Sequence, residues 1–186
     1  MAVVDMRLIS ATSLSPVQNA FFHAIWAWLA KAVDVDLTIK EIQKEPDVVH
    51  RCSLPTGQNL ERYEPIVAPV LARERYGDMP VYFSDLVVAP GVTGPPTRGW
   101  RIAYNEQDSL SGWFAPRWGL RALGLDPSSM TWIRTGSHLN SLMAIRRGEA
   151  EAGGIDSTVL DLTAGESAPG AGLEIVENFG PWPAPP

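Results

Sequence analysis

Three turns rich in hydroxyl groups each follow an apolar segment and precede a segment with helical character. These turns are Ser109-Leu110-Ser111-Gly112, Thr135-Gly136-Ser137-His138 and Ile155-Asp156-Ser157. The first turn of a helix has unpaired backbone N–H groups and a partial positive charge, so several such turns together can hold an oxyanion. The pattern therefore predicts a binding site for a small anion.

The side chains in these turns suit the recognition of an oxyanion. Ser109 and Ser111 supply hydroxyl groups, and Gly112 lets the backbone approach a ligand closely. The ring of His138 can donate a hydrogen bond or add a positive charge. Asp156 can orient His138 or accept a hydrogen bond from a protonated oxygen or an amine of the ligand. Serine and aspartate are also ordinary N-cap residues, and this simpler interpretation stands beside the functional one.

Other kinds of chemistry are less well supported by the sequence. Ser111 does not lie in a G-x-S-x-G motif, so the sequence does not indicate a serine hydrolase. No His, Asp or Glu pair has the spacing of a metal site, and we expect neither a metal nor a cofactor. The alternative to a binding protein is an enzyme, a transferase or hydrolase, that uses His138 as a general base oriented by Asp156.

Strands and helices alternate regularly after residue 99. The pattern predicts strands at residues 100–104, 131–134, 152–155 and 173–176, separated by helices at residues 112–123, 137–147 and 158–163. Such alternation implies a mostly parallel sheet flanked by helices, an α/β fold. Ligands of these sheets bind at the carboxyl ends of the strands, where all three turns lie.

The first half of the chain predicts a separate unit. A helix is expected from Pro16 to about Val33, with strands at residues 6–11, 35–39, 48–52, 66–71 and 80–88. The Gly- and Pro-rich segment that follows favours a boundary near residue 89, with a first lobe at 1–88 and a second at 89–178. Residues 179–186 are expected to form a Pro-rich terminal linker.

Composition excludes several classes of protein. Of 186 residues, 15 are basic and 21 acidic, which gives a net charge of −6, and no run of Lys or Arg indicates a nucleic-acid partner. An anion must therefore be held by local dipoles and hydrogen bonds rather than by the overall field. No apolar run approaches the roughly 20 residues of a membrane span. The N-terminal residues lack the pattern of a signal peptide.

The sequence resembles the substrate-binding proteins of phosphate, phosphite and phosphonate ABC transporters. The resemblance is carried by PVYFSDLVV at residues 80–88, WRIAYNEQDSLSG at 100–112, TGSH at 135–138 with Ser141, and GIDS at 154–157. An earlier segment, PDVVHRCSLP at 46–55, is similar to the family's strand and turn that face the cleft from the first lobe.

The resemblance implies a two-lobed type 2 periplasmic-binding-protein fold and a non-enzymatic function. The implied ligand is a small oxyanion, phosphate- or phosphonate-like, and the implied partner is an ABC transporter permease. The family's hydroxyl-rich turn matches residues 109–112, including Leu110, while His138 and Asp156 match residues in the cleft. Tyr82 is the expected aromatic residue of the cleft.

The resemblance also sets expectations about the whole protein. Members continue beyond the position of Pro186, so the first lobe is expected to be incomplete in a chain of this length. The implied location is periplasmic or extracytoplasmic, with a cytoplasmic location as the alternative because no leader is evident. The protein is expected to be a monomer.

Overall fold

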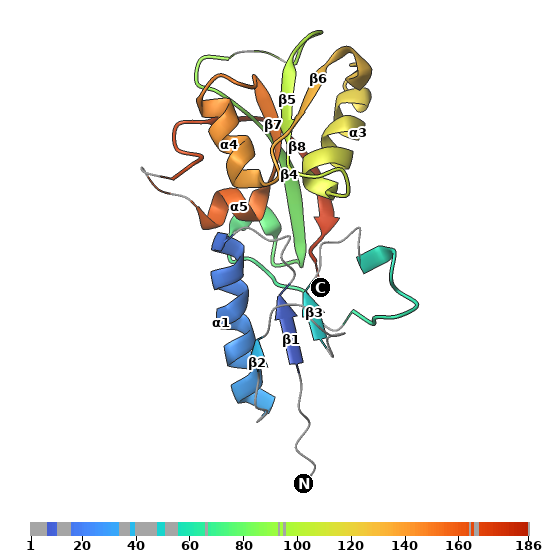
Figure 1. The fold of residues 1–186 in the computed structure, drawn as a ribbon, viewed down its shortest axis with the longest axis vertical. Coiled ribbons are helices and arrows are strands. Elements are labelled where there is room, and N and C mark those ends of the chain that lie inside the picture. Colours follow the sequence, from blue (N-terminus) through green and yellow to red (C-terminus); the bar gives the residue numbers. More distant parts are fainter. Residues whose placement is uncertain are drawn as a thin grey trace.

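The computed structural model describes residues 7–10, 16–33, 38–39, 48–50, 56–65, 67–92, 94, 96–163, 165 and 168–185. A small parallel sheet has the strand order β2-β1-β3, formed by Thr38–Ile39, Arg7–Ser10 and Val48–His50. Helix α1 (Pro16–Val33) lies beside it, as Figure 1 shows. None of the helices in the described part of the chain has the length and apolarity needed to cross a membrane.

A larger sheet contains five strands in the order β6-β5-β7-β4-β8. Strands β5, β6 and β7 are parallel, whereas β4 is antiparallel to both β7 and β8. The strands are β4 (Val81–Val88), β5 (Arg101–Tyr104), β6 (Thr131–Arg134), β7 (Ala152–Asp156) and β8 (Glu174–Pro183). The predicted alternation of strand and helix after residue 99 is thus confirmed.

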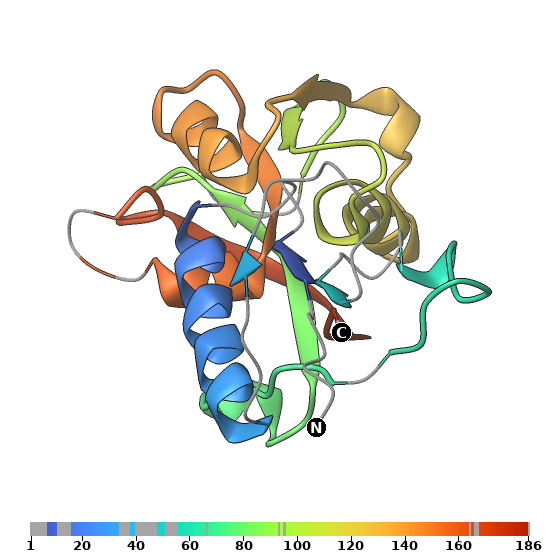
Figure 2. The ribbon, with the colours of Figure 1, turned by 60° about the horizontal axis from the view of Figure 1, so that its bottom comes forward.

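Helices cover both faces of the larger sheet. A π-helical segment, η2 (Leu110–Phe114), runs directly into α3 (Ala115–Ala122) on one face. Helices α4 (His138–Arg146) and α5 (Ser157–Leu162) lie on the other, and Figures 1 and 2 show the two groups on opposite sides. Two short 3-10 helices are η1 (Glu74–Tyr76) and η3 (Pro127–Ser129).

The alternating side chains of β4 divide the core into two parts. Leu86 and Val88 pack with Leu120 of α3, whereas Val87 packs with Leu142 of α4. All five are at most 1% exposed. Since both faces of β4 are covered, its last three residues, 86–88, form the unbroken apolar run that is typical of an interior strand.

The structure corrects the predicted limits of the two lobes. β4 pairs with β7 and β8 in the larger sheet, so it does not belong with the small sheet of the predicted first lobe, 1–88. Residues 67–71, within the predicted strand 66–71, are not in a strand; residue 66 is outside the described part. The motif at 46–55 is described only at Val48–His50.

The predicted linker at 179–186 is wrong, because β8 continues to Pro183 and pairs with β4. β8 is an edge strand of the larger sheet, where prolines that lack an N–H donor are tolerated. Phe179 packs closely against Gly119 of α3, and a Cβ at Gly119 would lie 2.1 Å from the Phe179 ring. Apolar packing therefore holds this proline-rich segment in the sheet.

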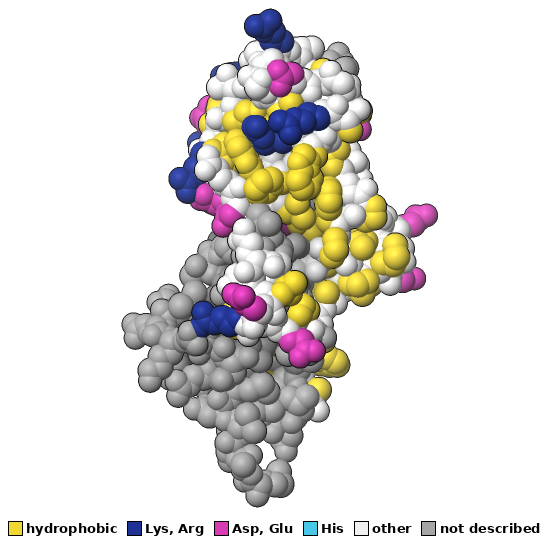
Figure 3. Space-filling view, turned by 90° about the vertical axis from the view of Figure 1, so that its right-hand side faces the viewer, with side chains coloured by type: hydrophobic (Ala, Val, Ile, Leu, Met, Phe, Trp, Pro, Cys, Tyr) yellow, Lys and Arg dark blue, Asp and Glu magenta, His cyan; other side chains and the backbone are white. Residues whose placement is uncertain are grey.

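Aromatic side chains extend this packing to the outer surface of α3. The ring of Trp118 lies 6.0 Å from that of Phe114 and 6.0 Å from that of Trp182, between centroids. Next to them, the guanidinium group of Arg117 lies 4.4 Å from the centroid of the Trp113 ring. Figure 3 shows hydrophobic side chains, interrupted by basic ones, on this side of the molecule.

Candidate functional site

The three hydroxyl-rich turns lie at one edge of the larger sheet. β5 lies between β6 and β7 and is parallel to both, so the carboxyl ends of the three strands point the same way. The chain leaves β5 for η2, β6 for α4 and β7 for α5. This geometry, in which parallel strands carry their turns to a common edge, is the one that the alternating pattern predicted.

Ser111, His138 and Asn105 form a compact polar cluster at this edge. The Oγ of Ser111 lies 3.1 Å from Nε2 of His138, and Nδ2 of Asn105 lies 3.3 Å from the same nitrogen. Ser111 and His138 are buried, at 4% and 8% exposed. The cluster brings together the end of β5, the start of η2 and the start of α4.

Two buried polar atoms of this cluster make no hydrogen bond with the described residues. They are Oδ1 of Asn105 and Nδ1 of His138, and the backbone of Gly154 lies near the imidazole without forming a well-aligned hydrogen bond to it. Buried polar atoms without partners are rare in folded proteins, and each one needs a specific reason. Polar groups are thus concentrated here beyond what the packing of the core requires.

Two glycines allow η2 to lie directly on the sheet. A Cβ at Gly112 would be 1.9 Å from Oδ1 of Asn105, so the asparagine side chain occupies the space that any other residue would need. A Cβ at Gly154 of β7 would be 2.8 Å from the carbonyl oxygen of Ser111. Ser84 of β4 donates a 2.6 Å hydrogen bond to that carbonyl, which fixes the first turn of η2.

Ser109 performs one of the two roles that its sequence position suggests, that of a cap. Its side chain is the N-cap of η2 and accepts a 3.0 Å hydrogen bond from the backbone N–H of Gly112. The N–H groups of Leu110 and Ser111 lie in the same first turn, which no earlier helical carbonyl can reach. The helix start therefore offers these two backbone donors beside the Ser111 hydroxyl.

Asp156 lies next to this cluster, at the end of β7. It is directly opposite Ser84 in the antiparallel pair with β4, and such pairs carry their side chains on the same face. Its Oδ1 accepts hydrogen bonds from the N–H and the hydroxyl of Thr158, at 2.8 and 2.7 Å, so Asp156 also caps α5. No hydrogen bond or ion pair among the described contacts joins it to His138.

Burial moves the pKa values of both titratable groups toward the neutral form. It lowers the pKa of His138 to about 4, against an opposing effect of the Gly154 backbone. It raises the pKa of Asp156 to about 6, and the two hydrogen bonds from Thr158 oppose that rise. Near neutral pH the histidine is therefore uncharged and Asp156 is close to its titration range.

Tyr82 belongs to the same face of β4 as Ser84, two residues away. It is only 3% exposed and pairs with Trp182 of β8. The structure thus places Tyr82 on the same face of the sheet as the site, but in the interior rather than on an open surface.

Asn105 and Ser84 were not predicted as site residues. Asn105 is the first residue after a predicted strand, and this position at the carboxyl edge could have identified it.

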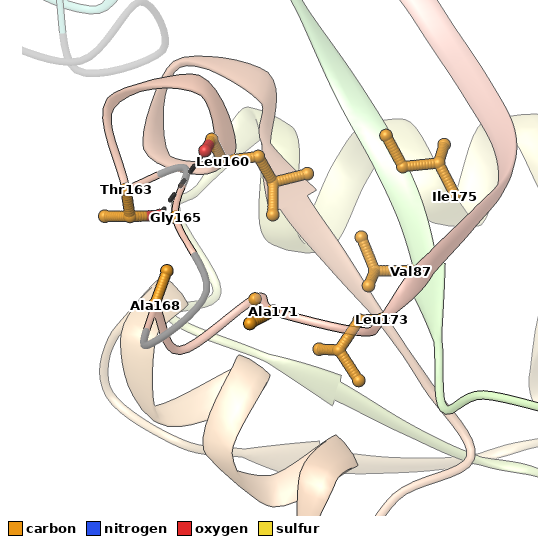
Figure 4. Close-up of a pocket in the computed structure, with 9 residues that line it drawn as sticks. Val87, Leu160, Thr163, Gly165, Ala168, Ala171, Leu173 and Ile175 are labelled. Atoms are coloured by element: carbon orange, nitrogen blue, oxygen red, sulfur yellow. Dashed lines mark hydrogen bonds between the residues drawn. The ribbon is translucent and has the colours of Figure 1, made fainter.

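An apolar pocket of about 200 Å³ lies elsewhere, beside α5 and β8 (Figure 4). Val87, Leu160, Leu173 and Ile175 line it together with small residues of the intervening loop. Its one polar side chain, Thr163, already donates to the carbonyl oxygen of Val159 at 2.5 Å. The described side chains that line the pocket therefore lack the free donors that an oxyanion needs. The described residues contain no group of three His, Cys, Asp or Glu side chains placed to hold a metal ion.

Comparisons with known proteins identify the family and the fold. The family model of periplasmic substrate-binding proteins of phosphonate ABC transporters matches residues 42–186. A search of curated proteins gave no match. PhnD1 from Prochlorococcus marinus, solved in complex with methylphosphonate, is 16% identical with a TM-score of 0.73, over 97% of this chain and 74% of that chain.

Two further solved structures share the fold. A binding protein component of an ABC phosphonate transporter from Pseudomonas aeruginosa is 13% identical with a TM-score of 0.70, over 97% of this chain and 67% of that chain. A Xanthomonas citri protein bound to ATP is 15% identical with a TM-score of 0.61, over 97% of this chain and 74% of that chain. The fold is that of the type 2 periplasmic-binding proteins. Because the family model covers most of its length, this chain belongs to the family of periplasmic substrate-binding proteins of phosphonate ABC transporters.

Proposed function

We propose that this protein binds a phosphonate-like oxyanion at the carboxyl edge of its larger sheet and presents it to an ABC transporter permease. The observation that supports the site is the buried contact of Ser111, His138 and Asn105 at the first turn of η2. The family supports the ligand class, and the similar PhnD1 is bound to methylphosphonate. The proposal includes a periplasmic location and a monomeric protein.

The proposed site would hold the anion through neutral donors and a helix start. The Ser111 hydroxyl and the uncharged ring of His138 lie together there, the backbone N–H groups of Leu110 and Ser111 belong to the same first turn, and Ser109 caps that turn. No Lys or Arg takes part in the described side-chain contacts of Ser111, His138 or Asp156. Asp156 would accept a hydrogen bond from a protonated oxygen of the ligand, and Tyr82 would close the site on the β4 side.

Recognition is favoured over catalysis. A general base works best when its pKa lies near the operating pH, and burial holds the pKa of His138 at about 4. Asp156 bonds to Thr158 rather than orienting the imidazole. The family is one of transport proteins, so binding without turnover is the expected activity.

Isothermal titration calorimetry with methylphosphonate, aminoethylphosphonate, phosphite, phosphate, sulfate and taurine tests the ligand class. We expect saturable binding of a phosphonate with a stoichiometry of one, and a rise in melting temperature from stabilisation of the native state. Binding of sulfate or taurine but no phosphorus oxyanion would contradict the proposal. Light scattering of the same sample tests the monomeric state.

Replacing Ser111 by alanine is expected to weaken methylphosphonate binding by about threefold to tenfold, because one buried hydrogen-bond donor is removed. The control is Ser128→Ala, since the Ser128 side chain is exposed and its described hydrogen bond is to its neighbour Asp126. That variant should bind like the wild type in the same calorimetric assay. Equal affinities for the wild type and Ser111→Ala would remove Ser111 from the site.

Methylphosphonate affinity is expected to fall as the pH rises from 6 to 8.5, by up to about tenfold per pH unit. In the proposed complex one proton is shared between the ligand and Asp156, whose pKa is raised to about 6. Above the pKa values of both groups, binding must take that proton from solvent. In Asp156→Asn an amide donates to the dianion without a proton, so the fall should be lost. Parallel pH profiles of the two proteins would contradict the role of Asp156.

A further inference from the structure

Tyr76 is buried on the face of the larger sheet opposite to Ser111. It lies in η1, the short green helix beside α5 in Figure 1, and is 1% exposed. Its ring centroid is 6.0 Å from that of Phe83, whose side chain alternates with that of Ser84 along β4. The tyrosine therefore has no direct access to the side of the sheet that carries the Ser111 cluster.

The hydroxyl of Tyr76 connects η1 to two residues one helical turn apart on α5. It donates a 2.6 Å hydrogen bond to Oδ2 of Asp161 and lies 3.1 Å from Oγ of Ser157. Residues i and i+4 lie on the same side of a helix, so this one hydroxyl holds the whole first turn of α5. α5 has only six residues, and a helix that short depends on such tertiary contacts.

Ser157 links the first turn of α5 to the end of the ladder between β4 and β7. Its Oγ is fully buried and accepts a 3.0 Å hydrogen bond from the backbone N–H of Phe83. The ladder of hydrogen bonds between β4 and β7 ends at the pair Ser84 and Asp156. Beyond it, the Ser157 side chain accepts the hydrogen bond of the next backbone N–H of β4, that of Phe83. Asp156, immediately before Ser157, is thus fixed between the last rung of the ladder and the first turn of α5.

We infer that Tyr76 is a positioning residue that sets the direction of the Asp156 carboxyl group by fixing Ser157 and the first turn of α5. The inference rests on the proposed function, in which Asp156 contacts the ligand. The Oδ1 of Asp156 is held by the N–H and hydroxyl of Thr158, so a shift of the first turn of α5 moves the carboxyl group with it. Tyr76 itself touches no ligand.

A double-mutant cycle with Tyr76→Phe and Asp156→Ala tests the inference. The phenylalanine keeps the buried ring and removes only the hydroxyl. We expect Tyr76→Phe to weaken methylphosphonate binding by about threefold to tenfold in the wild type and to have no effect when Asp156 is already alanine. The control is Thr163→Val, which removes a hydrogen bond at the other end of α5 and should leave affinity unchanged.

A readout without ligand separates this inference from the proposed function. Exchange of the Thr158 amide hydrogen should be faster in Tyr76→Phe than in the wild type, because the bond to Asp156 is loosened. Ser157→Ala should reproduce both effects and serves if Tyr76→Phe does not fold. Unchanged Thr158 exchange, or an equal loss of affinity with and without the Asp156 carboxyl group, would overturn the inference. If the wild type binds no phosphonate, the proposed function fails, and Thr158 exchange alone then decides whether Tyr76 holds the first turn of α5 and with it Asp156.

Discussion

Replacement of Gly112 by alanine is expected to weaken methylphosphonate binding by about thirtyfold to hundredfold, or about 2–3 kcal/mol. The added Cβ would lie 1.9 Å from Oδ1 and 2.9 Å from Cγ of Asn105. The Asn105 side chain must therefore turn away, and its contact with Nε2 of His138 is lost. The helix start cannot move instead, because the carbonyl oxygens of Ser111 and Gly112 already lie against Gly154.

The matched control for this change is Gly57→Ala. Of the residues that the structure describes, none has an atom within 4 Å of a Cβ at Gly57, so the substitution should change neither affinity nor stability by more than about 0.5 kcal/mol. Calorimetry gives the affinity of both variants, and thermal unfolding shows that both are folded. Wild-type affinity in a folded Gly112→Ala protein would place the ligand away from the first turn of η2.

Arg75→Met is expected to lower the free energy of unfolding by about 2–3 kcal/mol at pH 7, because it leaves a buried carboxylate without its charged partner. Asp85 is 0% exposed, and its Oδ1 accepts a 2.6 Å hydrogen bond from Arg75 and a 2.7 Å bond from Asn178. Its Oδ2 has no partner among the described residues. Thermal unfolding should show a melting temperature lower by roughly 4–12 °C.

The pH dependence of this loss has a definite sign. Burial raises the pKa of Asp85 in the folded protein, against the effect of Arg75, and removing Arg75 raises it further. When folding raises the pKa of a carboxyl group, that group stabilises the folded protein at a pH below its pKa in the unfolded chain. This contribution is lost as the pH rises through its pKa in the folded protein. The difference in free energy of unfolding between Arg75→Met and the wild type should therefore become smaller as Asp85 is protonated at acidic pH.

An exposed ion pair supplies the control for Arg75→Met. Arg134 is 63% exposed in its side chain and pairs with Glu106, so Arg134→Met should cost less than about 1 kcal/mol. Adding Asp85→Asn to Arg75→Met should recover part of the lost stability, because the buried charge is then gone. A loss no larger than that of Arg134→Met, or one that grows at low pH, would contradict this account of Asp85.

The boundary predicted near residue 89 shows that the sequence alone did not determine which sheet β4 joins. The described residues of the Gly- and Pro-rich segment after Val88 form neither helix nor strand, but this does not reveal which sheet the strand before the segment joins. β4 joins the larger sheet because its two apolar faces are covered by α3 and α4. Likewise, the prolines of residues 179–183 correctly indicated that this segment could not be an interior strand. Only the packing of Phe179 on Gly119 made the segment an edge strand.

The sequence by itself determined the alternation of strands and helices after residue 99 and the position of the three turns at one edge, because hydrophobic periodicity and capping residues act locally. It also identified the hydroxyls of Ser109 and Ser111 without distinguishing a cap from a donor. Tertiary structure alone decided that Asn105 lies against His138 and that Tyr76 reaches Ser157. Those contacts join residues up to 81 positions apart, so they depend on how the elements pack rather than on any local pattern.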